Sequence, residues 1–347
     1  MSEPPSGAAP IELETLTDGG QKPADVARGI AGFLAESTKS LDIALYDVRF
    51  ETDAGGLVLA ALLAAVQRGV AVRILYNVDH PGPIAVPPPP ETTPDSIEAL
   101  PVPTRGVAGV PDLMHHKYMI RDSHSVWTGS MNWTDDSWTR QENVVAIVDS
   151  PLVAAAFHRE FEQLVGAGTV GETGRVPPEW RDGIRVWFTP GYGEDLSHRI
   201  ALAVGQAKRR VRICSPVLTT PPVVGALAGA VVAGRVDVAG CVDGPQTRQA
   251  AHQWSLSRGR WKVRLLERLA GRFSAKPSTP YGVATVHDFM HAKVTVCDDT
   301  VFVGSFNLSR SGERNAENVI ELEDAELADT LAAFVDGVRG RYAPLEL

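Results

Sequence analysis

The chain has 347 residues, of which 44% are hydrophobic and 22% are charged, and its formal net charge is −9. This composition is that of an ordinary globular protein, and the length allows two domains or one large duplicated domain. The acidic balance disfavours non-specific contact with nucleic acid or anionic membranes. The longest apolar runs, 57–66 and 223–233, are too short to span a bilayer.

The N-terminal segment of residues 1–22 is predicted to be flexible. Residues 1–21 contain no Lys or Arg and no long apolar run, which argues against a secretory signal or a transit peptide. The three cysteines, Cys214, Cys241 and Cys297, stand at no metal-ligand spacing with another Cys or His. An odd and sparse cysteine count argues against a disulfide framework and suits a reducing compartment, so the sequence predicts a cytoplasmic location.

Hydrophobic periodicity predicts helices and strands in alternation along the first half. In chain order these are a helix over 24–36, a strand over 41–46, a helix over 56–67, a strand over 70–76, strands over 118–121, 126–128 and 144–148, and a helix over 152–164. The prolines at 87–90 exclude regular structure from the stretch 80–94.

The second half repeats this order of elements. It contains a predicted helix over 195–207, a strand over 211–215, a helix over 223–232, a strand over 236–242, strands over 294–296, 301–303 and 319–322, and a helix over 325–338. Such alternation indicates a sheet covered by helices on both faces. With 166–180 as the linker candidate, we expect one domain over 23–166 and a second over 181–345.

The same set of polar residues occurs once in each half. The first copy is His115, Lys117, Asp122, Gly129, Ser130, Asn132 and Glu142, and the second is His291, Lys293, Asp298, Gly304, Ser305, Asn307 and Glu317. His, Lys and Asp are offset by 176 residues, and Gly, Ser, Asn and Glu by 175. One H-x-K-x-x-x-x-D would occur by chance in roughly a few per cent of chains, but two extended copies at constant spacing exclude chance.

Two H-x-K-x-x-x-x-D motifs, each followed by G-S-x-N, resemble the signature of the phospholipase D superfamily. The resemblance covers the chain from about Ala24 to Val338. It implies an α/β fold that is a duplicated phospholipase D-like fold. Two similar α/β/α sandwich domains would be related by a pseudo-two-fold axis, and both motifs would meet at one site.

The residue types suit cleavage of a phosphodiester, which is an anion that repels nucleophiles. Its hydrolysis needs a nucleophile, an acid for the leaving oxygen, and donors or cations around the phosphoryl oxygens. Imidazole can serve in the first two roles, because its pKa lies near working pH. Two histidines facing one phosphate can therefore divide the labour, one attacking phosphorus and the other protonating the leaving group.

The resemblance implies a role for each motif residue. His115 would be the nucleophile and His291 the general acid and base, although the sequence alone treats the two alike and the order could be reversed. Lys117, Lys293, Asn132 and Asn307 would hold the phosphoryl oxygens, and Glu142 and Glu317 would each accept a hydrogen bond from a catalytic histidine. Supporting roles in the motif loops would fall to Ser130, Ser305, Gly129, Gly304, Asp122 and Asp298.

No metal or cofactor is expected. The sequence contains no phosphate loop of the Walker type and no acidic cluster typical of a Mg²⁺ or Zn²⁺ site, and lysine and imidazolium would supply the positive charge. His116, His124 and His287 have no counterparts in the other half and are interpreted as structural or solvated. Trp127, Trp133 and Trp138 are expected to pack in the core or to line the pocket.

A basic segment precedes the second motif. Residues 257–276 contain seven Lys or Arg and one acid, Glu267, so Arg260, Lys262 and Arg264 could bind a polyanionic substrate. A solvated loop face is the competing interpretation. We expect this segment and the stretch 80–94 to border the mouth of the site.

Three functions remain open from the sequence. The first is hydrolysis or transfer of phospholipid head groups, with transient contact to a membrane surface, no transmembrane segment and unspecified protein partners. The second is a nuclease that cleaves DNA or RNA. The third is an inactive scaffold, which the intact second copy contradicts. Because no amphipathic basic helix is predicted, a lipid would have to be reached by loops.

Overall fold

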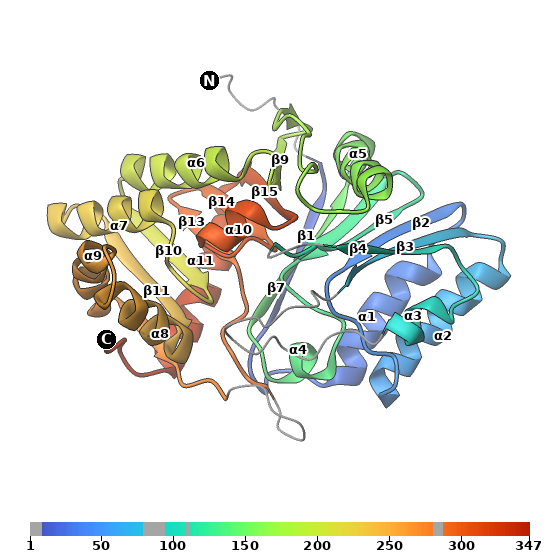
Figure 1. Ribbon diagram of the computed structural model, residues 1–347, viewed down its shortest axis with the longest axis horizontal. Coiled ribbons are helices and arrows are strands. Elements are labelled where there is room, and N and C mark those ends of the chain that lie inside the picture. The colour runs from blue at the N-terminus through green and yellow to red at the C-terminus, as the bar shows by residue number, and fades with distance from the viewer. Residues whose placement is uncertain (1–8, 79–93, 109–111, 280–286) are drawn as a thin grey trace.

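The computed structural model describes residues 9–78, 94–108, 112–279 and 287–347, and it shows two α/β halves side by side (Figure 1). Most of the predicted stretch 80–94 therefore lies outside the described residues. Each half contains one sheet, and the chain passes from the first half to the second after residue 167, where α5 ends.

The described residues of the first half form a seven-stranded sheet in the order β1-β7-β6-β5-β2-β3-β4. Its strands are β1 (Ile11–Leu16), β2 (Ser40–Leu45), β3 (Ala71–Val78), β4 (Thr104–Ala108), β5 (Lys117–Arg121), β6 (Ser125–Gly129) and β7 (Asn143–Asp149). Its helices are α1 (Pro23–Ala35), α2 (Asp53–Gln67), α3 (Pro94–Glu98), α4 (Asp135–Thr139) and α5 (Pro151–Ala167).

The described residues of the second half form an eight-stranded sheet in the order β12-β11-β10-β13-β14-β15-β9-β8. Its strands are β8 (Trp180–Arg181), β9 (Ile184–Thr189), β10 (Arg210–Ser215), β11 (Asp237–Asp243), β12 (Phe273–Lys276), β13 (Val294–Cys297), β14 (Thr300–Gly304) and β15 (Glu317–Glu323). Its helices are α6 (Gly193–Gln206), α7 (Pro221–Ala233), α8 (Gly244–Ser255), α9 (Arg260–Ala270), α10 (Arg310–Arg314) and α11 (Ala325–Arg341).

The two sheets repeat one topology, which confirms the predicted duplication. In each, three parallel strands (β2, β3, β4 and β10, β11, β12) continue into three antiparallel ones (β5, β6, β7 and β13, β14, β15). A seventh strand, β1 or β9, pairs with β7 or β15. Because the motif histidine precedes β5 or β13, the topology brings each one to the edge where the parallel strands end.

Helices cover both faces of each sheet. Helices α1 and α2 lie outside the first sheet, and α6, α7, α8 and α9 lie outside the second (Figure 1). One apolar cluster between the sheets contains residues of both halves, including Phe157 of α5, Phe188 of β9 and Val335 of α11. The halves therefore share a continuous core, in which burial of apolar side chains contributes roughly 25 cal/mol per Å² removed from water.

The two signature aspartates occupy the same place in their halves. Asp122 accepts hydrogen bonds from the backbone N–H groups of Thr38, Lys39 and Ser40, where β2 begins. Asp298 does the same for Lys208, Arg209 and Arg210, before and at the start of β10. Both aspartates have a positive φ, near 53° and 55°, which Asp tolerates better than most residues. Each one joins the turn after a motif strand to the start of the neighbouring strand.

Part of the N-terminal prediction is wrong. Ile11–Leu16 is strand β1, paired with β7 over six residues, and the side chain of Gln21 donates to the carbonyl of Trp138. The pattern Ile-Glu-Leu-Glu-Thr-Leu alternates apolar and polar residues, as an edge strand with one buried face does. Only residues 1–8 of the segment lie outside the description.

The basic segment also differs from the prediction. Residues 260–270 form α9, which packs on α7 and α8 through Leu266 and Leu269. The sequence therefore does contain an amphipathic basic helix, contrary to expectation. In the described residues no helix is both long and apolar enough to cross a bilayer, and the three cysteines are free and buried.

Candidate active site

The two motif histidines lie where the halves meet, and each is held by a side chain of the opposite half. His115 precedes β5 and contacts Glu317 at the start of β15, while His291 precedes β13 and contacts Asn143 at the start of β7. Both histidines are buried. The charges of His115 and Lys117 also lower the pKa of His291, which shows that the two motifs lie within electrostatic range of each other.

The His115 side of the site contains a buried carboxylate. Nδ1 of His115 donates to Oε2 of Glu317 at 2.8 Å, and Nδ2 of Asn315 donates to the other oxygen at 3.1 Å. Glu317 is completely buried. This arrangement fixes the tautomer of His115, so that its Nε2 is free to react, and the carboxylate stabilises a positive charge on the ring.

The His291 side contains an amide instead. Nδ1 of His291 lies 3.0 Å from Oδ1 of Asn143, which also accepts from the hydroxyl of Ser130 at 2.7 Å. Nδ2 of Asn143 donates to the carbonyl of Ser137, so the amide oxygen faces the histidine. Since an amide oxygen can only accept, Nδ1 of His291 carries a proton and Nε2 is the atom that exchanges one.

A one-residue difference in the register between the two halves explains why the two catalytic histidines have different partners. Across the interface Met114 forms a parallel bridge with Ala316, whereas the equivalent Met290 forms one with Glu142. The residues that follow therefore pair as His115 with Glu317 and as His291 with Asn143. Asn318 is the counterpart of Asn143, but it contacts a different histidine. Its Nδ2 lies 3.1 Å from Nδ1 of His116, the residue after His115, as expected from the one-residue shift.

The prediction that Glu142 accepts a hydrogen bond from a catalytic histidine is wrong. Its carboxylate accepts from Nζ of Lys276 at 2.9 Å and from the hydroxyl of Tyr342 at 2.5 Å. Lys276 is 1% exposed and Glu142 is fully buried, so each charge compensates the other away from water. The shifted register turns Glu142 toward this lysine, and Lys276 also contacts Asp18 at 3.2 Å.

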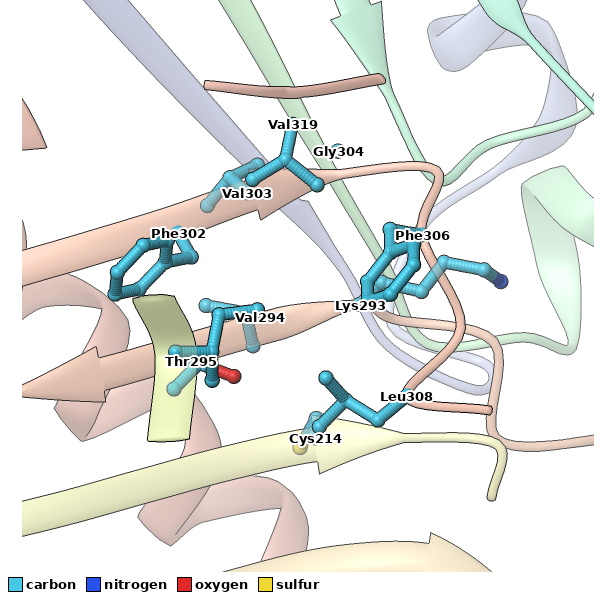
Figure 2. A pocket seen from close by; sticks show the side chains of 11 residues that line it. Cys214, Lys293, Val294, Thr295, Phe302, Val303, Gly304, Phe306, Leu308 and Val319 are labelled. Carbon is cyan, nitrogen blue, oxygen red and sulfur yellow. The ribbon is translucent and has the colours of Figure 1, made fainter. Parts of the chain in front are cut away.

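The motif lysines lie beside their histidines. Nζ of Lys117 donates to the carbonyl of His115 at 2.7 Å, and Nζ of Lys293 donates to that of His291 at 2.5 Å. The aliphatic part of Lys293 borders a void of about 10 Å³, which is too small for a substrate, and Figure 2 shows its ammonium turned away from the other lining side chains.

Burial dominates the protonation of these groups. It lowers the pKa of His115 to about 4 against the opposing effect of Glu317, and it lowers the pKa of His291 well below the ordinary value with no carboxylate opposing it. Burial also lowers the pKa of Lys117 to about 7 and that of Lys293 well below its usual range. A bound phosphodiester would reverse part of these shifts, because an adjacent anion favours the charged forms.

The two motif asparagines have unused hydrogen-bonding capacity. Among the described residues the amide oxygens of Asn132 and Asn307 are buried and have no partner. Each residue follows a motif glycine where the backbone is crowded: a Cβ on Gly129 would lie 2.2 Å from the carbonyl oxygen of Val144, and one on Gly304 would lie 2.0 Å from that of Asn318. Only glycine therefore fits these two turns.

Ser130 and Ser305 anchor the loops that carry the asparagines. The hydroxyl of Ser130 accepts from the backbone N–H of Val144, and that of Ser305 accepts from the backbone N–H of Asn318. These contacts join each G-S-x-N loop to the strand that follows it in its own half.

Different aromatic residues flank the two histidines. The ring of Tyr46, which follows β2, lies 4.7 Å from that of His115, and Nζ of Lys117 lies 4.7 Å from its centroid. The ring of Phe289 lies 4.8 Å from that of His291. His116 is buried, whereas the three tryptophans near the first motif, Trp127, Trp133 and Trp138, belong to the apolar core behind the first sheet.

The structure does not bring the three basic residues Arg260, Lys262 and Arg264 to the histidines. They lie on α9, at the outer side of the second half (Figure 1). Sequence reasoning also missed Asn143, Lys276 and Tyr46. A signal for Asn143 was present, because Glu-Asn occurs at the same place in both motifs, but only the glutamates were given a role.

The side chains of the site include few ligands for a metal ion. Within the described ranges no group of three or more His, Cys, Asp or Glu side chains is placed to hold one. The charges nearest the histidines come from lysines and from Glu317, and the lysines would bind a phosphoryl group directly.

Comparison with known proteins supports the duplication. The family model described as "Cardiolipin synthase, PLD-like domain" matches residues 30–165 and again residues 200–338. A mitochondrial cardiolipin hydrolase from Xenopus laevis is 32% identical over 108 residues, which are 30% of this chain and 46% of that protein. The match thus spans about half the length of this curated relative.

Two solved structures share the fold at low sequence identity. A phosphatidylserine synthase from Haemophilus influenzae has a TM-score of 0.62 at 13% identity, over 95% of this chain and 86% of that one. A polyphosphate kinase from Porphyromonas gingivalis has a TM-score of 0.59 at 13% identity, over 94% of this chain and 46% of that one. The two family matches cover most of the sequence, and the chain therefore belongs to the phospholipase D superfamily as a duplicated PLD-like protein.

Proposed function

We propose that the protein is a phosphodiesterase of the phospholipase D type. It hydrolyses or transfers phosphodiesters, chiefly those of phospholipid head groups, through a covalent phosphohistidine on His115. The observation that carries the proposal is the pair of buried imidazoles, one from each motif copy, each oriented through Nδ1 by the opposite half. This pairing supplies the nucleophile and the acid that the reaction needs at a single site.

In the first step the lone pair on Nε2 of His115 forms a bond to phosphorus. The bond from phosphorus to the leaving oxygen breaks, and Nε2–H of His291 gives its proton to that oxygen. In the second step water gives a proton back to His291 and attacks phosphorus, and the P–N bond breaks toward His115. An alcohol in place of water gives transfer. Lys117 and Lys293 would stabilise the negative charge on the phosphoryl oxygens.

The unequal partners support His115 as the nucleophile. Attack leaves a positive charge on the phosphorylated ring for the lifetime of the intermediate, and the carboxylate of Glu317 stabilises that charge. His291 has only an amide behind it, so its imidazolium is the stronger acid and gives up its proton more readily. The two histidines occupy equivalent positions in the motif sequence. The chemical difference between their partners, Glu317 and Asn143, distinguishes their proposed roles.

The proposed substrate class is supported by the names of relatives. The curated relative is a cardiolipin hydrolase, and one structural neighbour is a phosphatidylserine synthase, although the latter likeness concerns the fold alone. We expect transient contact with a membrane surface and, given three free thiols, a cytoplasmic location. Nucleic acid is the competing substrate.

The test compares substrates side by side. Purified protein is incubated with vesicles of phosphatidylcholine, phosphatidylglycerol or cardiolipin, and with single- and double-stranded DNA and RNA, each with and without EDTA. We expect released head group from at least one lipid and no loss in EDTA. Cleavage of nucleic acid with no lipid turnover would replace the proposal by a nuclease, and activity that needs an added divalent ion would remove the metal-free mechanism.

The intermediate has its own test. A denaturing quench of rapid turnover at alkaline pH, followed by proteolysis and mass spectrometry, should find an acid-labile phosphoryl adduct on His115. An adduct on His291 would exchange the two roles. Net inversion at a chiral phosphorus would contradict the covalent route, because two displacements require retention.

A further inference from the structure

A basic and apolar surface lies on α9 and on the turns at its two ends, and the proposed chemistry does not use it. We call it the α9 surface. It consists of Leu256, Arg258, Arg260, Trp261, Arg264, Arg268 and Arg272, all of them exposed. Six basic residues and one acid occur between 256 and 272, in a chain whose formal net charge is −9. The positive charge is therefore concentrated at one place on an acidic protein.

Helical spacing arranges these residues in a line. Arg260, Arg264 and Arg268 recur every four residues and so share one face of α9, while Leu266 and Leu269 pack inward. Trp261 lies beside this line, since it is one residue after Arg260. Within the described residues, none of the arginines of the α9 surface pairs with a carboxylate, so their charge is available to a partner.

Large apolar side chains accompany the charge. Leu256 is 76% exposed and Trp261 is 52% exposed. Nζ of Lys262 lies 4.9 Å from the ring centroid of Trp254 and 5.8 Å from that of Trp261, so the ammonium group contacts a tryptophan of α8 and one of α9. Exposed leucine and tryptophan next to unpaired arginines are typical of surfaces that rest in the headgroup region of a bilayer.

We propose that the α9 surface binds membranes that contain anionic phospholipid. The arginines would face phosphate groups and anionic head groups, and Leu256 and Trp261 would insert at the boundary of the acyl chains. The proposal rests on the proposed function in one respect, because a phospholipid substrate gives such a surface its purpose. It assigns the membrane contact to a defined helix rather than to loops.

The observations favour a bilayer over nucleic acid. Arginines and tryptophan would suit a nucleic-acid backbone and bases as well, but an exposed leucine cannot stack on a base. Leu256 therefore decides between the two partners.

The experiment measures sedimentation of the protein with vesicles. One set contains phosphatidylcholine alone, and the other also contains phosphatidylglycerol, each at low and at high salt. The triple variant Arg260→Gln, Arg264→Gln and Arg268→Gln should lose affinity for the anionic vesicles on the order of a hundredfold, because each charge near such a surface contributes roughly fivefold. Trp261→Ala should lose about tenfold, and its loss should persist at high salt.

A matched control removes the same charge elsewhere. Lys22→Gln, Arg28→Gln and Lys39→Gln change three exposed basic residues of the first half, and this variant should bind vesicles like the wild type. Leu152→Ser is the matched apolar control, since Leu152 is 53% exposed on α5. Circular dichroism and thermal unfolding verify that every variant is folded.

The outcomes separate this proposal from the proposed function. Wild-type protein that binds neither vesicle set, or a triple variant that binds like the charge control, would overturn the α9 surface as a membrane contact. Loss of DNA binding in a gel-shift assay, with vesicle binding intact, would assign the surface to nucleic acid instead. Binding to anionic vesicles without release of any head group would leave this inference standing and would contradict the lipid substrate.

Discussion

The two copies of the motif have kept their sequence but not their surroundings. His115 is held by a buried carboxylate, Glu317, whereas His291 is held by the amide of Asn143. In contrast, the two signature aspartates make the same contacts in both halves. The two copies therefore make the same contacts within each half, and they make different contacts across the interface between the halves.

The cause of this difference is geometric rather than compositional. Both halves contain a glutamate followed by an asparagine at the same place, and a one-residue change in register decides which of the two faces the histidine. Lys276 then neutralises the glutamate that was turned away. Identical residues can therefore acquire different tasks without any substitution in the motif itself.

The largest effect is expected from removal of either imidazole. His115→Ala and His291→Ala should each lower kcat by at least about 10⁴-fold, because the two groups act as a unit. Single-turnover kinetics of both variants on the best substrate would measure this. Retention of about half the activity by either one would mean that the copies work independently.

Glu317→Gln tests the carboxylate behind His115. We expect a loss of about 10²- to 10⁴-fold in kcat, as for removal of a charge that stabilises an imidazolium. The pH profile of kcat/KM should also change. His115 must be neutral to attack, so activity is lost as the pH falls through its pKa of about 4.

Because Glu317 raises that pKa, its removal should move the acid limb to lower pH. The alkaline limb should also move to lower pH, because it reflects loss of charge from Lys117, whose pKa of about 7 is set by burial, which lowers it, and by Glu317, which raises it. An acid limb that moves upward would contradict this assignment of roles.

Asn143→Asp would make the two sides alike. A carboxylate behind His291 should raise the pKa of that imidazole and make it a weaker acid, so kcat should fall by about tenfold to a hundredfold while the imidazole signal in NMR titrates at higher pH. Asn143→Leu, which removes the acceptor, serves as the comparison. Faster turnover by the aspartate variant would reverse the roles of the histidines.

Lys276→Met should disturb stability more than chemistry. It leaves the buried charge of Glu142 without its cation, which costs about 3–5 kcal/mol in free energy of unfolding. The double variant Lys276→Met with Glu142→Gln removes both charges and should recover most of that loss. If Glu142→Gln alone abolished turnover in a folded protein, the motif glutamate would have a catalytic role after all.

The smallest effect is expected at the two signature aspartates. Hydrogen bonds from the backbone N–H groups of Ser40 and Lys39 and from Thr38 outweigh burial and lower the pKa of Asp122 to about 2, below its ordinary value of 3.8. Its stabilising effect is therefore complete above the ordinary value and is lost as the pH falls through about 2. Asp122→Asn and Asp298→Asn should each cost about 1 kcal/mol at pH 7, without change in kcat, measured by chemical denaturation.

Much of the fold was predictable, because strands with buried runs and helices with regular apolar spacing recur in both halves in one order. The exceptions have physical reasons. β1 is short and contains Glu12, Glu14 and Thr15, so its alternation looks polar until β7 pairs with it. The arginines of α9 concealed a helix whose inward face consists of only a few leucines.

The catalytic residues could be proposed from the duplication, but not their partners. A sequence gives the order of residues within each half, and it does not give the offset at which one half docks against the other. That offset selects Asn143 over Glu142. Lys276 could not be recognised for the same reason, since its carboxylate lies 134 positions away in the chain.

The shared core between the sheets has a consequence for how the molecule must assemble. Thr128 donates to Asn318 across the interface, and the apolar cluster around it extends without a break from α5 to α11. A half released from its partner would expose that cluster to water. The catalytic centre therefore forms only when the two halves dock in the last step of folding. A chain in which only the first half has folded has no catalytic activity.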